Sequence, residues 1–468
     1  MLKKIIRFIR NCNTFVNVYS KKIDEIEKNV NSLSNDFINA KNNAKDDLLK
    51  MEEQIKNLDY VNLEYINLHT DVSKNRVLIV GFYGAPNLGD ELMLFSILNK
   101  LSPIDSGLDI TVMMSENFNF DITDYPKCKI IHYPKNIIDI NILANYYDTV
   151  IIGGGALLDD TDYTLNSNML SLPTTLINLS YRMITCKKNV ILYGLSSSYE
   201  LNNKEFIRKL NYISSNANYF SLRDTNSLKI LNKCGINTNK IRIVHDLAYT
   251  LDYCKYNKTL KNDSCTRVGL IYVCNENNYD KLCELTKNIV KYFKEKKQDY
   301  KIVMIPFYEY LNNDTGYYKK IIEYLNDKNI ENLDYTSNVD EVFNTISNLD
   351  VCVSMRYHGT LISNMLGVPT LTLLYYIHKH YKNKVGYLYE NYGYKNYQVN
   401  YSSTNSELFI NTFDKLCKLQ KNKLLSKQVN NEANQQIDEV LKKFVLKESK
   451  VKYCGYWLCR LYWKSHLC

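Results

Sequence analysis

An arginine and a histidine stand two residues apart after an apolar segment. Arg356 and His358 lie within residues 351–376, which read as a buried strand, a helix over residues 360–366 and a second apolar strand. Alternate residues of a strand share a face, and ligands of open α/β sheets bind at the carboxyl ends of the strands. Arg356 carries a permanent charge that can fork onto a carboxylate or phosphate, whereas His358 titrates near neutral pH. The pair predicts an anion-binding group beside a proton donor.

A glycine-rich turn follows another apolar segment, which begins at Arg76. This turn, residues 81–91, leads into a helix predicted over residues 92–101. Glycine lets a backbone approach a ligand closely, and the N–H groups at a helix start favour anions. The turn has neither the spacing of a dinucleotide fingerprint nor the Gly-Lys-Ser/Thr of a P-loop. Asp90 and Glu91 either take part in a site or cap the helix. The candidate substrate-binding residues of the turn are Gly84, Asn87 and Gly89.

Two more strand ends carry candidate residues. Gly153, Gly154 and Gly155 follow a buried strand, where they would permit backbone contact with a sugar or phosphate or simply form a tight turn. Arg223 ends a further strand beside a helix start, which predicts a second cation at a strand end. Taken alone, Arg356 could pair with an acid and His358 could be a structural histidine. The glycine-rich turns favour the functional interpretation, because they are typical of phosphate-handling folds.

Strands and helices alternate regularly around these positions. The alternation runs through residues 76–255 and again through residues 266–400, with a polar linker over residues 251–266. Such alternation predicts parallel sheets covered by helices, and two such units predict two domains that face each other across a cleft. The flanking segments are residues 1–75 and 401–468.

The two flanking segments predict helices and surface contacts. Residues 1–18 form a basic amphipathic stretch that could rest on anionic lipid or be a solvated end. Apolar residues from Ile23 to Leu58 recur at coiled-coil spacing, which predicts a long helix that forms a homo-oligomer or packs on a partner. Residues 401–468 predict two helices and an aromatic, basic tail that suits a membrane interface or packs on the protein body.

Composition narrows the class of protein. With 468 residues and 45% hydrophobic residues, the chain can build two cores. Its net charge of +9 suits anionic small molecules or a membrane surface, and the absence of a dense basic tract argues against nucleic acid. Thirteen cysteines without a C-x-x-C pair predict reduced thiols and no zinc site. The sequence has no apolar run of about 20 residues, so no membrane-spanning helix is predicted. We therefore expect a cytoplasmic protein, with peripheral membrane contact left open.

Taken in order, these motifs resemble the polysaccharide pyruvyl transferase family. The resemblance covers roughly residues 76–386, including Gly-Val-Pro at residues 367–369 and Lys379. It implies a fold of two Rossmann-like domains (GT-B-like) and transfer of an enolpyruvyl-derived group from phosphoenolpyruvate to a sugar, which forms a pyruvate ketal and releases phosphate. Residues 194–198 (Gly-Leu-Ser-Ser-Ser) depart from the family's Gly-Ile-Gly-Pro-like loop, which changes the polarity of the predicted cleft.

The resemblance also implies residue roles. His358 is expected as the general acid, and Asp90 as the base or the group that orients an acceptor hydroxyl. Arg223, Arg356 and Lys379 are expected to bind the carboxylate and phosphate of the donor. No metal and no cofactor are expected. The acceptor is a sugar, a nucleotide-sugar or a lipid-linked glycan.

Two other functions fit the sequence. One is a GT-B-type glycosyltransferase that uses a nucleotide sugar. The other is a non-catalytic scaffold of a glycan-assembly complex, in which the flanking segments carry the function.

Overall fold

The computed structural model describes residues 74–102, 107–115, 128–163, 170–256, 265–310, 313–375, 388, 397–419 and 424–446, all within one compact unit. The predicted amphipathic stretch and coiled coil, Lys379, and the aromatic tail lie outside the described residues.

The first sheet has seven parallel strands in the order β3-β2-β1-β4-β5-β6-β7. Its strands are β1 (Asn75–Val80), β2 (Leu108–Met114), β3 (Lys129–His132), β4 (Thr149–Gly155), β5 (Asn189–Leu195), β6 (Tyr219–Leu222) and β7 (Arg242–Ile243). Its helices are α4 (Leu88–Leu101), α5 (Ile137–Tyr146), α6 (Leu172–Thr185), α7 (Lys204–Asn216) and α8 (Thr225–Lys233). All seven residues of β4 are buried, as expected for a central strand of a sheet covered on both faces.

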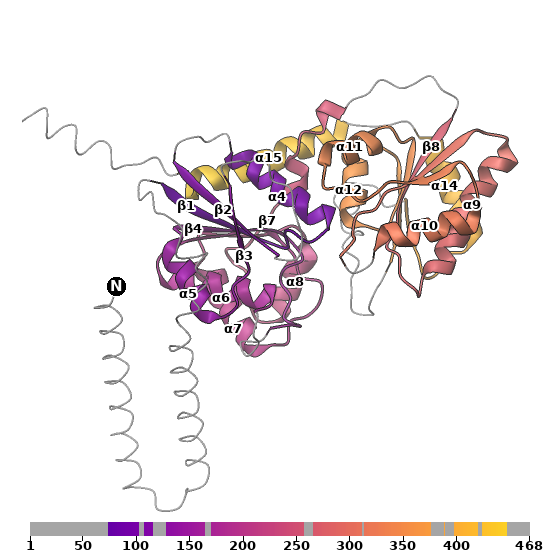
Figure 1. The fold of residues 1–468 in the computed structure, drawn as a ribbon. Coiled ribbons are helices and arrows are strands. Elements are labelled where there is room, and N and C mark those ends of the chain that lie inside the picture. The colour runs from indigo at the N-terminus through magenta and orange to yellow at the C-terminus, as the bar shows by residue number, and fades with distance from the viewer. Residues whose placement is uncertain are drawn as a thin grey trace, which may run out of the picture. The chain divides into compact units, whose positions relative to one another are not determined.

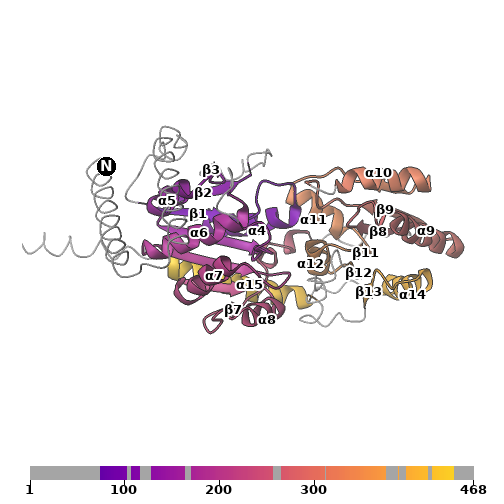
Figure 2. The same cartoon turned by 90° about the horizontal axis from the view of Figure 1, so that it is seen from below.

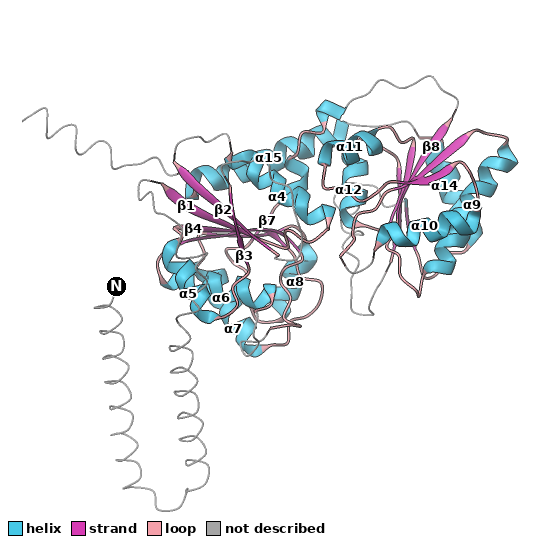
Figure 3. Ribbon diagram, in the orientation of Figure 1, coloured by secondary structure: helices cyan, strands magenta, loops and turns pink. Residues whose placement is uncertain are grey.

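The second sheet has six parallel strands in the order β10-β9-β8-β11-β12-β13. Its strands are β8 (Thr266–Ile271), β9 (Tyr300–Met304), β10 (Ile330–Asn332), β11 (Val351–Ser354), β12 (Thr370–Leu374) and β13 (Gln398–Asn400). Its helices are α9 (Tyr279–Lys296), α10 (Asp314–Leu325), α11 (Val339–Ser347), α12 (Tyr357–Met365) and α14 (Ser406–Cys417). Figures 1 and 2 show α9, α10 and α14 on one face of this sheet and α11 and α12 on the other. The predicted two-domain α/β fold is confirmed, and Figure 3 shows its alternation of helices and strands.

The last described helix, α15 (Leu424–Phe444), returns to the first sheet. Its residues Ile437, Val440 and Leu441 belong to the same buried cluster as Val77 of β1. Nδ2 of Asn75 donates a 2.9 Å hydrogen bond to the carbonyl of Val445, just beyond the helix. In Figure 1, α4 and α15 cover one face of the first sheet and α5, α6 and α7 cover the other. By contrast, α14 completes the core of the second sheet.

Two helices begin earlier than the sequence predicts. The helix expected over residues 92–101 starts at Leu88, because the N–H groups of Asp90 and Glu91 donate to the carbonyl of Asn87. The helix expected over residues 360–366 starts at Tyr357, because the N–H of Thr360 donates to the carbonyl of Arg356. Asp90 and His358 therefore lie in first helical turns, and the expected strand-face relationship of Arg356 and His358 is wrong.

Two connecting 3-10 turns, η2 (Leu247–Thr250) and η3 (Cys254–Tyr256), follow β7 and precede the second sheet. No helix among the described residues is long and apolar enough to cross a membrane.

Candidate active site

Arg223 and Asp246 form a buried ion pair at the carboxyl ends of two neighbouring strands. Arg223 directly follows β6, and Asp246 follows β7 as the N-cap of η2. Nη1 of Arg223 lies 2.6 Å from Oδ2 of Asp246, and the side chains are 5% and 0% exposed. Burial alone would raise the pKa of Asp246, but the charges of Arg223 and His358 hold it well below its ordinary value. Asp246 is therefore a carboxylate at neutral pH.

The ring of His358 comes to this ion pair from the second domain. Its Nε2 is buried and lies 3.6 Å from Oδ1 of Asp246. The neighbouring Tyr357 places its ring 4.4 Å from Cζ of Arg223, a cation–π distance. The structure thus brings together Arg223 and His358, two predicted site residues from different domains.

Gly89 lies directly against the imidazole of His358. A Cβ atom at position 89 would be 2.0 Å from Nδ1 of His358, so any side chain there would displace the ring. Beside it, Asp90 is half-buried and accepts a 2.5 Å hydrogen bond from Nδ2 of Asn87. Its Oδ1 lies 3.2 Å from the position that a Cβ at Gly155 would occupy. Gly89, Asp90 and His358 therefore occupy one region, at the start of α4.

The triple glycine, which the sequence placed after a strand, forms the last three residues of β4 and packs against protein side chains. A Cβ at Gly153 would be 2.3 Å from Cδ1 of Ile97, and one at Gly154 would be 2.3 Å from Sδ of Met93. Gly155 has φ +101°, a conformation that other residues rarely adopt. Gly84 has φ +76°. Internal packing and backbone conformation thus account for these glycines, and their contact with a ligand stays a prediction.

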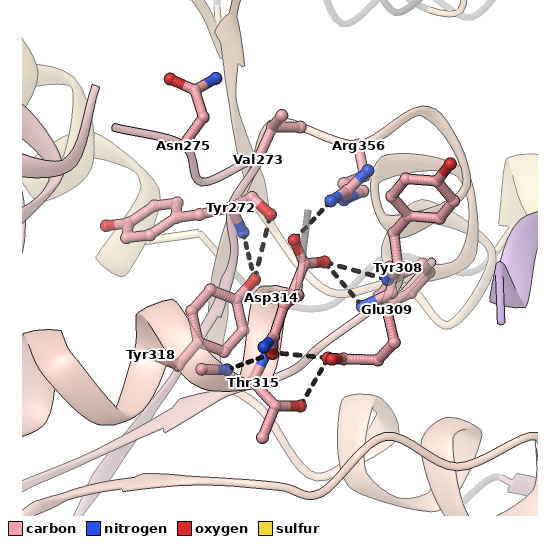
Figure 4. A network of polar contacts seen from close by, with 12 residues as sticks. Tyr272, Val273, Asn275, Tyr308, Glu309, Asp314, Thr315, Tyr318 and Arg356 are labelled. Atoms are coloured by element: carbon pink, nitrogen blue, oxygen red, sulfur yellow. Dashed lines mark hydrogen bonds and ion pairs between the residues drawn. The ribbon is translucent and has the colours of Figure 1, made fainter. Parts of the chain in front are cut away.

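Arg356 is held by a buried acid of its own domain. Its Nη2 lies 2.5 Å from Oδ1 of Asp314, whose side chain is 0% exposed. Its Cζ lies 5.3 Å from the centre of the Tyr308 ring, and its Nε makes no hydrogen bond within the described part of the chain. Figure 4 shows this arrangement. Burial raises the pKa of Asp314, and the charge of Arg356 opposes that rise. Arg356 is therefore paired with an acid, which was the alternative to a ligand-binding role considered from the sequence.

A hydrogen-bond network fixes the loop that carries Asp314. Oδ2 of Asp314 accepts from the backbone N–H groups of Phe307 and Tyr308 at 3.1 and 3.0 Å. Oε1 of Glu309 accepts from the N–H and hydroxyl of Thr315 at 2.7 and 2.6 Å (Figure 4). The same loop contacts the glycine-rich turn of the first domain, because the N–H of Leu88 donates to the carbonyl of Phe307 at 3.0 Å. Arg356 is thus tied to a loop that contacts the start of α4.

Sequence reasoning missed two acids of the site. Asp246 follows an apolar segment, as Arg223 does, so its place at a strand end was a usable signal. Asp314 had none, because its pairing with Arg356 depends on the loop between β9 and α10. Within the described residues, no group of three His, Cys, Asp or Glu side chains could hold a metal ion.

The two parallel-sheet domains place this chain in the GT-B-like class of folds. UDP-GlcNAc 2-epimerase from Methanocaldococcus jannaschii superposes with a TM-score of 0.50 at 13% identity, covering 78% of this chain and 99% of that one. HepE from Anabaena, solved with UDP and glucose, has a TM-score of 0.50 at 10% identity, covering 79% and 99%. At these identities the likeness concerns the fold alone.

The family model of the polysaccharide pyruvyl transferases matches residues 87–378, more than half of the chain. The protein therefore belongs to the polysaccharide pyruvyl transferase family. The matched region contains Asp90, Arg223, Arg356 and His358 and ends one residue before Lys379. No curated protein sequence matches the chain.

Proposed function

We propose that the protein transfers a pyruvyl group from phosphoenolpyruvate to two hydroxyls of a sugar, which yields a pyruvate ketal and inorganic phosphate. The observation that carries the proposal is the approach of His358 to the Arg223–Asp246 ion pair at the carboxyl ends of β6 and β7. Family membership supports the same class of reaction.

His358 and Asp90 serve as acid and base in this proposal. His358, as an imidazolium, protonates the methylene carbon of the donor, and the neighbouring carbon becomes electrophilic. A first acceptor hydroxyl adds to that carbon and loses its proton to Asp90. A second hydroxyl then displaces phosphate, which departs with the remaining proton. The donor thus becomes a methyl ketal carboxylate, and one phosphate is released for each ketal formed.

The cations bind the donor. Arg223 and Arg356 come from different domains, and phosphoenolpyruvate carries both a carboxylate and a phosphate. An arginine has five N–H donors, so pairing with Asp246 or Asp314 leaves others for the donor. Lys379 is proposed as a third cation. The acceptor is a sugar, free, nucleotide-linked or lipid-linked, and no cofactor is proposed.

The test combines binding and turnover. Phosphoenolpyruvate and a set of nucleotide sugars are added separately, and the melting temperature is measured with each. Phosphate release is then followed with phosphoenolpyruvate and a panel of free, nucleotide-linked and lipid-linked sugars. A rise in melting temperature with phosphoenolpyruvate and acceptor-dependent phosphate release support the proposal. Stabilisation by a nucleotide sugar alone would instead assign a glycosyltransferase. No response to either class would favour a scaffold.

A further inference from the structure

The carboxylate of Asp246 has a defined partner on each side. Oδ2 receives Nη1 of Arg223 at 2.6 Å, and Oδ1 accepts a 2.9 Å hydrogen bond from the backbone N–H of Ala248. The side chain is 0% exposed, so water does not compete for either oxygen. The start of η2 and the guanidinium of Arg223 therefore fix the carboxylate from two directions, and Oδ1 faces His358.

The two ring nitrogens of His358 have different surroundings. Nε2 is buried and faces Asp246 at 3.6 Å, just outside hydrogen-bond distance. Nδ1 lies against Gly89, where the ring takes the space that a side chain would fill. Unlike Nε2, it is not among the fully buried polar atoms of the described residues that lack a hydrogen-bond partner. An ionised carboxylate can only accept hydrogen bonds. A proton on the nitrogen that faces the carboxylate is attracted to it, whereas a lone pair there is repelled, so Asp246 favours the neutral tautomer with its proton on Nε2.

We propose that Asp246 is a positioning residue that keeps the proton of His358 on Nε2 and thereby makes Nδ1 the reacting nitrogen. The identity of the reaction rests on the proposed function. The position of the ring proton, which Asp246 sets, does not depend on it. During the proton transfer, the bond between Nδ1 and its hydrogen breaks as the new carbon–hydrogen bond forms on the donor methylene. The ring is left neutral with its proton on Nε2, beside the carboxylate. The 3.6 Å separation closes when the donor binds, as catalytic hydrogen bonds that are long in ligand-free enzymes often do.

Asp246 also couples the acid to an anion-binding residue. The same carboxylate pairs with Arg223 and faces His358, and the ring of Tyr357, the first residue of α12, lies against the guanidinium. A donor anion that binds Arg223 would therefore change the charge around Asp246, the carboxylate that faces His358.

The substitution D246N distinguishes this role from a purely structural one. The amide is nearly the same size as the carboxylate, but its NH2 group can donate to Nε2, which moves the ring proton to Nδ1. We expect kcat to fall by about 100- to 10,000-fold, which is the rate factor that a correctly positioned general acid contributes. The Kd for phosphoenolpyruvate should rise much less than kcat falls.

The matched control is D148N. Asp148 also pairs with an arginine, Arg76 at 2.9 Å, but at the opposite, amino-terminal end of the first sheet. D148N should therefore leave kcat within about threefold, since surface-near ion pairs contribute little.

The decisive readout is the histidine tautomer, observed by 15N NMR on protein labelled at histidine. The His358 signal is identified by its loss in H358Q. Ligand-free wild-type protein at high pH should show the proton on Nε2, and D246N should show it on Nδ1. A wild-type ring protonated on Nδ1, or a D246N variant with unchanged kcat, would overturn the inference.

The wild-type measurement needs no substitution, so it applies even if D246N does not fold. If phosphoenolpyruvate proves not to be the donor while the proton is on Nε2, the proposed function fails and the positioning role survives.

Discussion

The hydroxyl of Tyr335 donates a 2.9 Å hydrogen bond to Oε2 of Glu91, which links the loop after β10 to the first turn of α4. Glu91 is 2% exposed, and burial raises its pKa to about 8, with the nearby Asp90 acting in the same direction and the Tyr335 hydrogen bond opposing it. Glu91 thus joins the two domains. From the sequence it was considered only as a site residue or a helix cap.

The first prediction concerns the stability of this link. A raised folded-state pKa means that the folded protein holds a proton which the unfolded chain releases near pH 4.5. The contribution of this proton to the free energy of unfolding is complete below that pH and is lost as pH rises towards 8. We expect the free energy of unfolding to fall between pH 5 and 8 by at most about 5 kcal/mol from this group.

E91Q should flatten that decline, because a glutamine does not titrate and can still accept from Tyr335. Urea unfolding of both proteins at several pH values measures the difference. Parallel curves for wild type and E91Q would show that Glu91 titrates normally. Comparing the two proteins cancels the contributions of other buried acids such as Asp314.

The second prediction concerns G89A. A methyl group at this position would lie 2.0 Å from Nδ1 of His358, so the ring must move. We expect kcat to fall by more than about 100-fold, as for loss of a positioned general acid. G107A is the control, because nothing lies within 4 Å of a Cβ at Gly107. Phosphate release measures both, and equal rates for G89A and wild type would contradict the placement of the ring.

Sequence reasoning located most of the strands and the two domains, because buried parallel strands leave long apolar runs. It placed the starts of α4 and α12 three to four residues late, since Asn87 and Arg356 already accept the first helical hydrogen bonds. Because of that error, His358 was expected on a strand face, whereas it lies in the first turn of α12.

The partners of the site residues depend on tertiary contacts that no local pattern encodes. Asp246 meets His358 only because the two domains touch, and Asp314 meets Arg356 only through the path of one loop. The return of α15 is equally hidden, because its amphipathic pattern predicts a buried face without saying which core receives it.

The third prediction concerns R356A. Removing the cation leaves Asp314 buried without its partner, which should destabilise the fold by about 3 kcal/mol. R356A/D314N should recover most of that loss, because the uncompensated charge is gone. Both variants should bind phosphoenolpyruvate more weakly than wild type does. R242A, which removes an exposed arginine of β7, is the control for charge. Stability is measured by urea unfolding and binding by calorimetry. Equal donor affinity in R356A and wild type would remove Arg356 from the binding site.

The fourth prediction concerns H358A. The substitution removes the proposed acid but none of the proposed cations, so turnover should be lost while the Kd for phosphoenolpyruvate rises only modestly. H132A, on β3, removes a histidine that the proposed site does not use. Phosphate release and calorimetry give the two quantities. Full activity in H358A would assign the acid to another residue.

The return of α15 to the first sheet also has a consequence for biosynthesis. Val440 and Leu441 complete the buried cluster beneath β1, so the half of the protein that emerges first from the ribosome cannot finish packing until translation has passed α15. Folding in the usual amino-terminal-first order is therefore interrupted.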